Sequence, residues 1–549
     1  MKETFFNIIK TIVLLGLIAG LFYLNNMATI DGGSGIKTAN PNLTIYGDNI
    51  DSSYQPYVNN GKTYISTKTI GTFIDDNILF DNAAQKVIIT TDDAVYKFKI
   101  NDTVATKNLK EYSCGEALIE YNESPYLLID AVKEAYNIKS DYDEDTNTIS
   151  IDKKGTSDIP LNYNGVKVYS DIKTNSDIIA TLSTKNTVTV YTESLKHVRW
   201  YKVKTDDGKI GYIEKSAVTV KSEEEIEKEQ KQEEASKEKI IGFWQYGSNV
   251  DTLGAKIDTV DVVMPTWFAL SDEDGSVEMK YSKEYYQKAK ANGYKIWPII
   301  TNGLDSQSKD YIEFTSICMN SEDSRENLIK NIIDILDTYK IDGINVDFEN
   351  MREADKYMYT QFLRELHPVM KEKGKTLTVD VYFTSYIDRA GIGHACDYLM
   401  LMGYDQRGNW STEAGSISEI PWVKERLESL INDSNIEPSK IILGVPFYTR
   451  LWNVAEDGTI TTNVYSMKNS QDFVDKYNLT KKMDEEAGQN YVELNDTYIT
   501  YKLWIEDADS MKKRADLVNE LGLAGIAAWQ KGFETQDIWT VLDNTLKAK

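Results

Sequence analysis

Residues 240–549 contain eight short, nearly continuous apolar runs, separated by stretches in which apolar residues recur at helical spacing. Such runs predict parallel β-strands, because strands of this kind are buried on both faces. The predicted strands span residues 240–246, 260–270, 294–300, 341–349, 376–383, 397–405, 441–448 and 525–529. A (β/α)8 barrel typically has about 250 residues, so the region has the size and element order of that α/β fold.

The connection between the seventh and eighth predicted strands is unusually long, running over residues 449–524. A structureless loop of this length is rare within a compact domain. We therefore predict a small α+β insertion near residues 464–505 of the barrel.

The N-terminal region, residues 1–32, is dominated by an apolar stretch, residues 5–24, which is broken only by Asn7 and Lys10. As a helix this stretch can cross a hydrocarbon core of about 30 Å. The first charge after it is Asp31, so the positive-inside rule predicts a cytoplasmic stub and an extracellular remainder. A cleaved signal peptide is the alternative to a single-pass membrane anchor, and both export the rest of the chain.

Residues 33–155 contain an internal repeat at an offset of 62 residues. Its matching positions include Tyr64 with Tyr126, Ile70 with Val132, Phe80 with Tyr142, Val87 with Ile149 and Ile89 with Ile151. Each copy predicts a short strand, an amphipathic helix and an alternating strand. This α+β region has two open interpretations, a wall-binding or partner-binding module and a simple stalk.

Two further segments precede the barrel. Residues 160–220 alternate apolar and polar positions between turn signals, with an Asp207-Gly208 hairpin turn, which predicts a small β-barrel. Residues 221–239 consist mostly of Lys and Glu, with Glu four residues before Lys in three pairs. This pattern predicts a solvated helical linker.

Composition limits the possible chemistry. The formal net charge of −25 argues against nucleic acid as a partner, since nucleic-acid binding needs a basic surface. The chain has 3 Cys and 3 His, and their scattered positions match neither a zinc site nor a Ser-His-Asp triad. We expect no metal and no organic cofactor, and we expect carboxylates to perform any catalysis.

The fourth predicted strand carries the candidate chemistry in the sequence DGINVDFE, residues 342–349. Asn345, Asp347 and Glu349 alternate with apolar residues, so their side chains should share one face and point into the barrel mouth. Two neighbouring carboxylates repel each other when ionised, so the pKa of one should rise and provide a general acid. A solvated strand end or a cation site is the alternative.

These motifs resemble glycoside hydrolase family 18, the chitinase-like enzymes. DGINVDFE is similar to the family sequence D-x-x-D-x-D-x-E, Met402-Gly403-Tyr404-Asp405 to its M-x-Y-D element, and Trp529 to the tryptophan that ends strand eight. The sequences MPTWFAL, WPIITNG and GVPFYTR resemble the branch of spore and cell-wall N-acetylglucosaminidases. Residues 33–155 resemble the copper-amine-oxidase N-terminal-like domain, and residues 160–220 resemble a bacterial SH3-type domain.

The resemblance implies a role for each residue of the motifs. Glu349 would be the acid and base, and Asp347 would orient the substrate acetamido group, whose carbonyl attacks the anomeric carbon in place of an enzyme carboxylate. Tyr404 would hydrogen-bond the acetamido oxygen, and Asp405 would support the sugar or the acid.

The remaining candidates are substrate-binding residues. Trp529 would form the floor of the sugar subsite, and Trp267 would also lie in the substrate site. Gln406, next to the Tyr404-Asp405 pair, is a further substrate-binding candidate, with a surface loop as the alternative. Asn345 stands where chitinases have aspartate, and an amide cannot take a proton. We expect Asn345 still to hydrogen-bond Asp347.

The leading hypothesis is a surface-anchored hydrolase of the β-1,4 bonds at N-acetylglucosamine in peptidoglycan, with retention of configuration. A chitinase-type hydrolase, a non-catalytic glycan-binding protein and a wall scaffold are the alternatives. The presence of Glu349 favours an enzyme over a lectin. Endo or exo action, vegetative wall or spore cortex, and the oligomeric state remain open.

Overall fold

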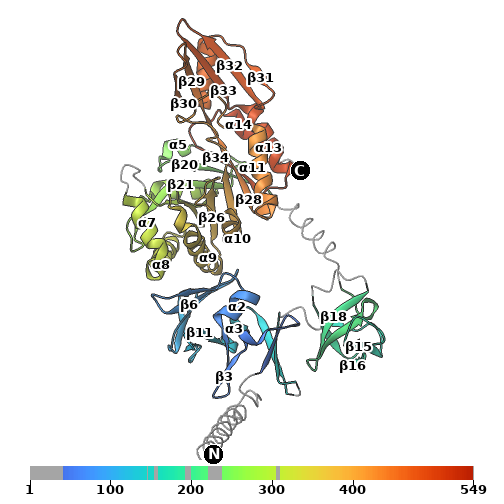
Figure 1. Ribbon diagram of the computed structural model, residues 1–549. Coiled ribbons are helices and arrows are strands. Elements are labelled where there is room, and N and C mark those ends of the chain that lie inside the picture. Colours follow the sequence, from blue (N-terminus) through green and yellow to red (C-terminus); the bar gives the residue numbers. More distant parts are fainter. Residues whose placement is uncertain are drawn as a thin grey trace, which may run out of the picture. The chain divides into compact units, whose positions relative to one another are not determined.

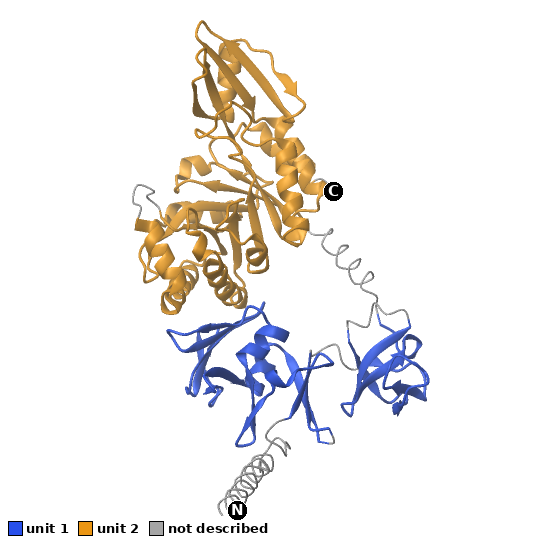
Figure 2. Ribbon diagram, in the orientation of Figure 1, with its two compact units in different colours: residues 1–230 blue, residues 231–549 orange. Residues whose placement is uncertain are grey.

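The computed structural model describes all residues except 1–40, 145, 154–158, 192–198, 221–237, 304–309 and 548–549. The chain divides into two compact units, Met1–Gln230 and Lys231–Lys549 (Figure 2). Within the described residues no helix is long and apolar enough to cross a membrane. The predicted membrane span and nearly all of the predicted charged linker lie outside the described residues.

The second unit contains a closed parallel barrel, which confirms the predicted (β/α)8 fold (Figure 1). Its strands are β20 (Ile240–Gln245), β21 (Val262–Leu270), β23 (Lys295–Ile296) with β24 (Ile299–Thr301), β25 (Gly343–Asp347), β26 (Thr376–Val381), β27 (Tyr398–Met402), β28 (Ile441–Pro446) and β34 (Gly525–Trp529). Each strand pairs with the next in parallel, and β20 closes the barrel by pairing with both β21 and β34. A short strand, β22 (Val277–Met279), pairs antiparallel with β21.

Helices surround the barrel between the strands. They are α5 (Val250–Leu253), α6 (Lys283–Ala291), α7 (Asp310–Asn320), α8 (Glu322–Thr338), α9 (Lys356–Glu372), α10 (Arg389–His394), α11 (Ile420–Asn432), α13 (Ala508–Glu520) and α14 (Asp537–Leu542). In α8 the predicted apolar stripe, which includes Leu328, Ile332 and Leu336, is buried. Ser321 caps the N-terminus of this helix, because its side chain accepts a hydrogen bond from the Ser324 amide.

The interior of the barrel is filled by inward side chains. Trp244, Met264, Trp297 and Met400 belong to a cluster of buried apolar residues with Ile299. Because strand residues alternate between the two faces, residues 345, 378 and 400 share this inward orientation. The barrel is therefore a packed core, and the site lies where the packing ends, at the C-terminal strand ends that we call the mouth.

The insertion after β28 is a five-stranded antiparallel sheet with one helix, which confirms the predicted subdomain. It comprises β29 (Tyr448–Ala455), β30 (Ile460–Ser466), α12 (Met467–Lys476), β31 (Lys482–Asp484), β32 (Gln489–Asn495) and β33 (Ile499–Ile505). The insertion begins at Tyr448, earlier than predicted, because the apolar run from residue 441 to 448 contains the end of β28 and the start of β29. One continuous apolar run can therefore conceal the boundary between two sheets.

The repeat in the first unit gives two similar α+β halves. The first contains β3 (Tyr57–Asn59), β4 (Lys62–Ser66), α2 (Thr67–Phe73), β5 (Leu79–Asp81) and β6 (Lys86–Thr90), and the second contains β10 (Leu118–Tyr121), β11 (Ser124–Leu128), α3 (Ile129–Ala135), β12 (Ile138–Asp143) and β13 (Thr148–Lys153). The remaining strands are β1 (Asn42–Ile45), β2 (Asp48–Asn49), β7 (Val95–Lys99), β8 (Val104–Lys107) and β9 (Lys110–Ser113).

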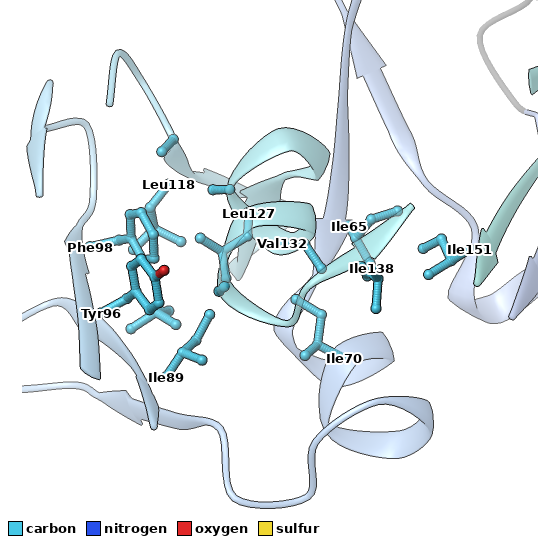
Figure 3. Close-up of a cluster of buried hydrophobic side chains, with 14 of the residues drawn as sticks. Ile65, Ile70, Ile89, Tyr96, Phe98, Leu118, Leu127, Val132, Ile138 and Ile151 are labelled. Atoms are coloured by element: carbon cyan, nitrogen blue, oxygen red, sulfur yellow. The ribbon is translucent and has the colours of Figure 1, made fainter. Parts of the chain in front are cut away.

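The two halves share one apolar core (Figure 3). The repeat partners Ile70 and Val132 are both buried in it, one from each helix. Strands β4 and β11 pair antiparallel, so each copy completes the other's sheet. The duplication therefore explains how two short segments form one stable core.

The SH3-type region follows within the same unit. Its strands are β14 (Ile159–Pro160), β15 (Val166–Tyr169), β16 (Ile178–Leu182), β17 (Thr187–Val190), β18 (Trp200–Thr205) and β19 (Ile210–Glu214). The predicted hairpin turn joins β18 to β19, and Gly208 adopts a φ of 88°, which a side chain would disfavour. Tyr201 and Val203 of β18 belong to the apolar core of this small barrel, whereas Trp200 is buried edge-on against Tyr169, with ring centroids 5.5 Å apart.

Candidate active site

Glu349 lies just beyond the end of β25, on the loop that leaves the barrel. Asn302 holds its backbone from both sides: Nδ2 donates to the Glu349 carbonyl at 2.8 Å, and Oδ1 accepts from the Glu349 amide at 3.0 Å. Phe348 points outward and stacks on Tyr359 and Phe362 of α9, with ring centroids 5.6 and 6.1 Å away. The loop is thus anchored in the helix layer, and the Glu349 carboxyl group is held at the mouth.

The surroundings of Asp347 and Glu349 raise the pKa of both carboxyl groups. Burial raises the pKa of Asp347 well above its ordinary value, and the charges of Asp380 and Glu349 raise it further. Burial also raises the pKa of Glu349, with a smaller contribution from Asp405. A carboxyl group with a raised pKa keeps its proton at higher pH, as a general acid near neutrality requires.

Asn345 lies deeper, inside the barrel, with a fully buried side chain. Its Nδ2 donates to Thr378 Oγ1 at 3.0 Å and to Asp380 Oδ1 at 2.9 Å, and its Oδ1 accepts from Trp244 Nε1 at 3.3 Å. The predictions that Asn345 binds substrate and hydrogen-bonds Asp347 are therefore wrong. Its amide hydrogens are committed to β26, and burial leaves no surface for a sugar.

Asp380 is a member of the site that the sequence analysis missed. It lies near the end of β26 and is 4% exposed. Burial, with a smaller contribution from the charge of Glu349, raises its pKa to about 8, although hydrogen bonds from Asn345 and Trp244 oppose the shift. The signal was present in the sequence TLTVDVYF, where an aspartate occupies an alternate position of an otherwise apolar strand.

Tyr404 and Asp405 follow β27, as the motif predicts. Burial raises the pKa of Tyr404 well above its ordinary value, and the charges of Asp380 and Asp347 contribute, so the Tyr404 ring lies close to the buried carboxylates. Asp405 is exposed and adopts a positive φ of 57°. Tyr448 Oη donates to Asp405 Oδ1 at 2.5 Å, which fixes this carboxylate beside the mouth.

Trp529 ends β34 and forms an aromatic wall of the mouth. Its ring is half-buried and has Tyr448 and Phe533 edge-on, with centroids 5.0 and 5.9 Å away. The Tyr404 ring lies 6.5 Å from it. The structure therefore gathers Asp347, Glu349, Tyr404 and Trp529 from three different strands at one end of the barrel.

A family model supports this arrangement independently. The model for glycosyl hydrolases family 18 matches residues 239–534, more than half of the 549 residues. The chain belongs to this family. This membership agrees with the family that the motifs predicted. Models for the copper amine oxidase N-terminal domain and the bacterial SH3 domain match residues 44–151 and 164–219, which confirms both of those resemblances.

Several curated proteins are similar to the family 18 region. A Bacillus subtilis protein that carries the name sporulation-specific glycosylase, YdhD, is 29% identical over 39% of this chain and 52% of its own length. The cortical fragment-lytic enzyme of Bacillus subtilis is 25% identical over 45% of this chain and 59% of its own length. The chain thus covers little more than half the length of these two relatives.

A solved structure has the same fold. The spore cortex-lytic enzyme SleL of Bacillus megaterium is 21% identical, with a TM-score of 0.51, over 57% of this chain and 76% of that chain. At this identity the likeness concerns the fold of the family 18 barrel alone.

Trp267 is not part of the family 18 site, contrary to the prediction. It is fully buried and packs edge-on against Tyr281 and Tyr285, with centroids 5.1 and 5.8 Å away. The register of β21 shifts between Thr266 and Phe268, and the contact with Tyr285 places Trp267 on the outer face, against α6.

Gln406, predicted to bind substrate, is engaged by Glu419 in this structure. Its Nε2 donates to Glu419 Oε2 at 2.8 Å, and its Oε1 accepts from the Glu419 amide at 3.0 Å. Arg407 Nη1 donates to the same carboxylate at 2.7 Å. Both ends of the Gln406 amide are therefore used to shape the loop after Asp405.

Proposed function

We propose that this family 18 hydrolase cleaves β-1,4 bonds at N-acetylglucosamine in peptidoglycan, with retention of configuration and assistance from the substrate. The observation that carries the proposal is the grouping of Asp347 and Glu349, both with raised pKa, beside Tyr404 and Trp529. Such a site combines a proton donor, a charge-stabilising carboxylate and an apolar ring for a sugar face.

Glu349 is the general acid in this proposal. It lies at the mouth, and its raised pKa keeps a proton available for the leaving-group oxygen of the glycosidic bond. After the first step the Glu349 carboxylate takes a proton from the incoming water. The fixed backbone of Glu349, held by Asn302, keeps the donor in place through both steps.

Asp347 faces the sugar that is cleaved. The acetamido carbonyl oxygen of that sugar attacks the anomeric carbon as the glycosidic bond breaks, and an oxazolinium ion forms. Asp347 accepts a hydrogen bond from the acetamido N–H and stabilises the positive charge that develops there. Asp347 is half-buried at the end of β25, so part of the residue is accessible for this contact.

Peptidoglycan is proposed as the substrate because the similar curated proteins are named for spore glycosylase and cortical fragment-lytic activity. The mechanism requires a 2-acetamido group, which peptidoglycan and chitin both provide. Chitin therefore belongs in every assay as the competing substrate.

The decisive experiment incubates the full chain with purified peptidoglycan and, in parallel, with chitin, and identifies the products by mass spectrometry. We expect new N-acetylglucosamine reducing ends from peptidoglycan and loss of at least about 100-fold in kcat for Glu349→Gln. The matched control is Glu353→Gln, an exposed glutamate four positions later, which should retain parental activity.

Two results would reject the proposal. Turnover that is unchanged in Glu349→Gln would exclude Glu349 as the acid. An inverted anomeric product in proton NMR, or failure of a thiazoline analogue of N-acetylglucosamine to inhibit, would exclude substrate assistance.

We also propose that the catalytic unit acts outside the cell. The support is the apolar stretch at residues 5–24 with basic residues only at its N-terminal end. Fractionation of cells that produce the tagged chain should place it in the membrane fraction. Recovery from cytosol without detergent would reject this localisation.

A further inference from the structure

We propose that Asp380 is the proton partner of Asp347, replacing the carboxylate that Asn345 cannot supply. The inference rests on the proposed function of Asp347, and it assigns Asp380 as a positioning residue that acts through Asp347. Three features support it: the strand register, the hydrogen bonds of Asn345, and the charges that act on the two aspartates, which among the described residues come from other carboxylates.

The register of β25 and β26 brings the two aspartates together. Asn345 is paired with Thr378 and Val346 with Val379, so one further step along both strands places Asp347 beside Asp380. Both aspartates lie an even number of residues from the inward-facing Asn345–Thr378 pair, so both face the barrel interior. Two carboxyl groups from neighbouring strands therefore share one end of the core.

Asn345 fixes the orientation of Asp380. Its Nδ2 hydrogen bond at 2.9 Å to Asp380 Oδ1 holds that carboxyl group against the strand, and Trp244 holds Asn345 in turn at 3.3 Å. An amide in this position donates a hydrogen bond but cannot accept a proton from Asp347. The proton-accepting group beside Asp347 is therefore on β26, not on β25.

Electrostatics require the pair to keep a proton. Burial raises the pKa of both carboxyl groups, that of Asp380 to about 8, and the charge of Asp380 raises the pKa of Asp347 further. Two carboxylates at neighbouring positions of the core do not both ionise, so the pair keeps at least one proton at neutral pH.

The shared proton gives the pair a function in the reaction. When positive charge develops on the acetamido nitrogen, the proton resides on Asp380 and Asp347 is anionic. When water opens the oxazolinium ion, the charge disappears and the proton is again shared by the pair. No proton is gained or lost, and Glu349 separately supplies and recovers the proton of the glycosidic oxygen.

The test compares D380N and the exchanged double variant N345D/D380N with the parent, in the full chain. D380N keeps the size of the side chain and an acceptor oxygen for Asn345, and it removes the ionisable group. We expect kcat to fall about 100-fold with KM within about threefold. The double variant returns a carboxylate to β25, and its kcat should exceed that of D380N at least about tenfold.

The pH profile supplies a second readout. The groups that face Asp380 are Asp347 and Glu349 from β25 and its loop, Tyr404 after β27 and Tyr359 of α9. Near neutrality only the carboxyl groups among them titrate. In the parent the alkaline limb of kcat reports proton loss from the pair and from Glu349, whereas in D380N it should report fewer groups and become shallower.

A measurement without substrate separates this inference from the proposed function. Carbon NMR of carboxyl-labelled aspartate, assigned with Asp347→Asn, should show Asp347 titrating at lower pH in D380N than in the parent. If the parent cleaves no glycan, the proposed function fails while this titration still decides the pairing. An unchanged Asp347 titration, or kcat of D380N within threefold of the parent, would overturn the inference.

Discussion

The barrel unit buries carboxylates in two ways, and their comparison separates structure from chemistry. Glu365 and Glu506 are fully buried, and each meets a buried arginine: Arg325 Nε lies 3.1 Å from Glu365, and Arg514 Nη2 lies 2.6 Å from Glu506. Asp347 and Asp380 are buried beside each other, and the charges that act on them are negative. A fold gains nothing from the second arrangement, because each unpaired charge is costly to bury.

The paired glutamates hold elements together. Glu365 of α9 meets Arg325 of α8, so this pair joins two helices outside the barrel. Glu506 also accepts from Gln489 at 2.6 Å and from Ser510 at 2.8 Å, which links the inserted sheet to α13. In this unit, the carboxylates with a cation partner join structural elements, whereas the carboxylates that lie beside a second acid belong to the proposed active site.

The largest expected effect is on activity, at the uncompensated site. Asp347→Asn should lower kcat about 100- to 1,000-fold, because the charge that stabilises the acetamido nitrogen is lost. The same substitution removes a charge that opposes burial, so the melting temperature should stay the same or rise. Steady-state kinetics and thermal unfolding of one preparation test the expected effects on activity and on stability. A lower melting temperature with normal kcat would show that Asp347 is a structural carboxylate.

Removal of a paired carboxylate should have the opposite outcome. Glu365→Gln leaves Arg325 buried without its counter-ion and should lower the free energy of unfolding by about 3 kcal/mol. The kcat per folded molecule should be unchanged, since the pair lies in the helix layer. Denaturant unfolding measures the effect.

A surface pair is the control for that experiment. Glu326→Gln breaks the exposed contact with Lys330 within α8 and should cost less than about 1 kcal/mol. Equal losses of unfolding free energy in the Glu326→Gln and Glu365→Gln variants would show that burial does not increase the contribution of an ion pair to stability.

The pH dependence of stability should sharpen the contrast. The folded-state pKa of Asp380 is about 8, above its unfolded value, so its contribution to stability is present at low pH and is lost as the pH rises towards 8. The melting temperature of D380N relative to the parent should therefore increase from about pH 4 to about pH 8. A difference that is constant over this range would contradict the raised pKa.

The smallest expected effect concerns Asp405. Its charge raises the pKa of Glu349, so Asp405→Asn should lower that pKa and move the alkaline limb of kcat/KM to lower pH, by about half a unit. The matched control is Glu353→Gln, an exposed carboxylate that is not among the groups that raise the pKa of Glu349. A limb that moves equally in both variants would indicate a general charge effect instead.

Much of the site could be predicted from local patterns. Asp347 and Glu349 were identified because alternation along one strand is a local property, and the outward packing of Phe348 confirms it. Trp267 was misassigned, since its contact with Tyr285 places it on the outer face. The side-chain alternation along this strand was not taken into account when Trp267 was assigned to the site.

Other features depended on contacts between distant segments. Asp380 is 33 positions after Asp347, and only the pairing of β25 with β26 makes them neighbours. The sequence shows Gln406 only as a polar residue beside the motif. The fold brings Glu419, at the start of α11, into hydrogen bonds with both ends of the Gln406 amide. Such partners cannot be chosen from sequence spacing, because many polar side chains are equally close along the chain.

The sequence by itself determined the eight strands, the repeat, the order of domains and the position of the proposed acid, because hydrophobic periodicity is set residue by residue. Only the tertiary structure decided which buried carboxylates have a cation and which have another carboxylate. That choice depends on which strands and helices pack together, and it fixes the pKa values on which the proposed chemistry relies.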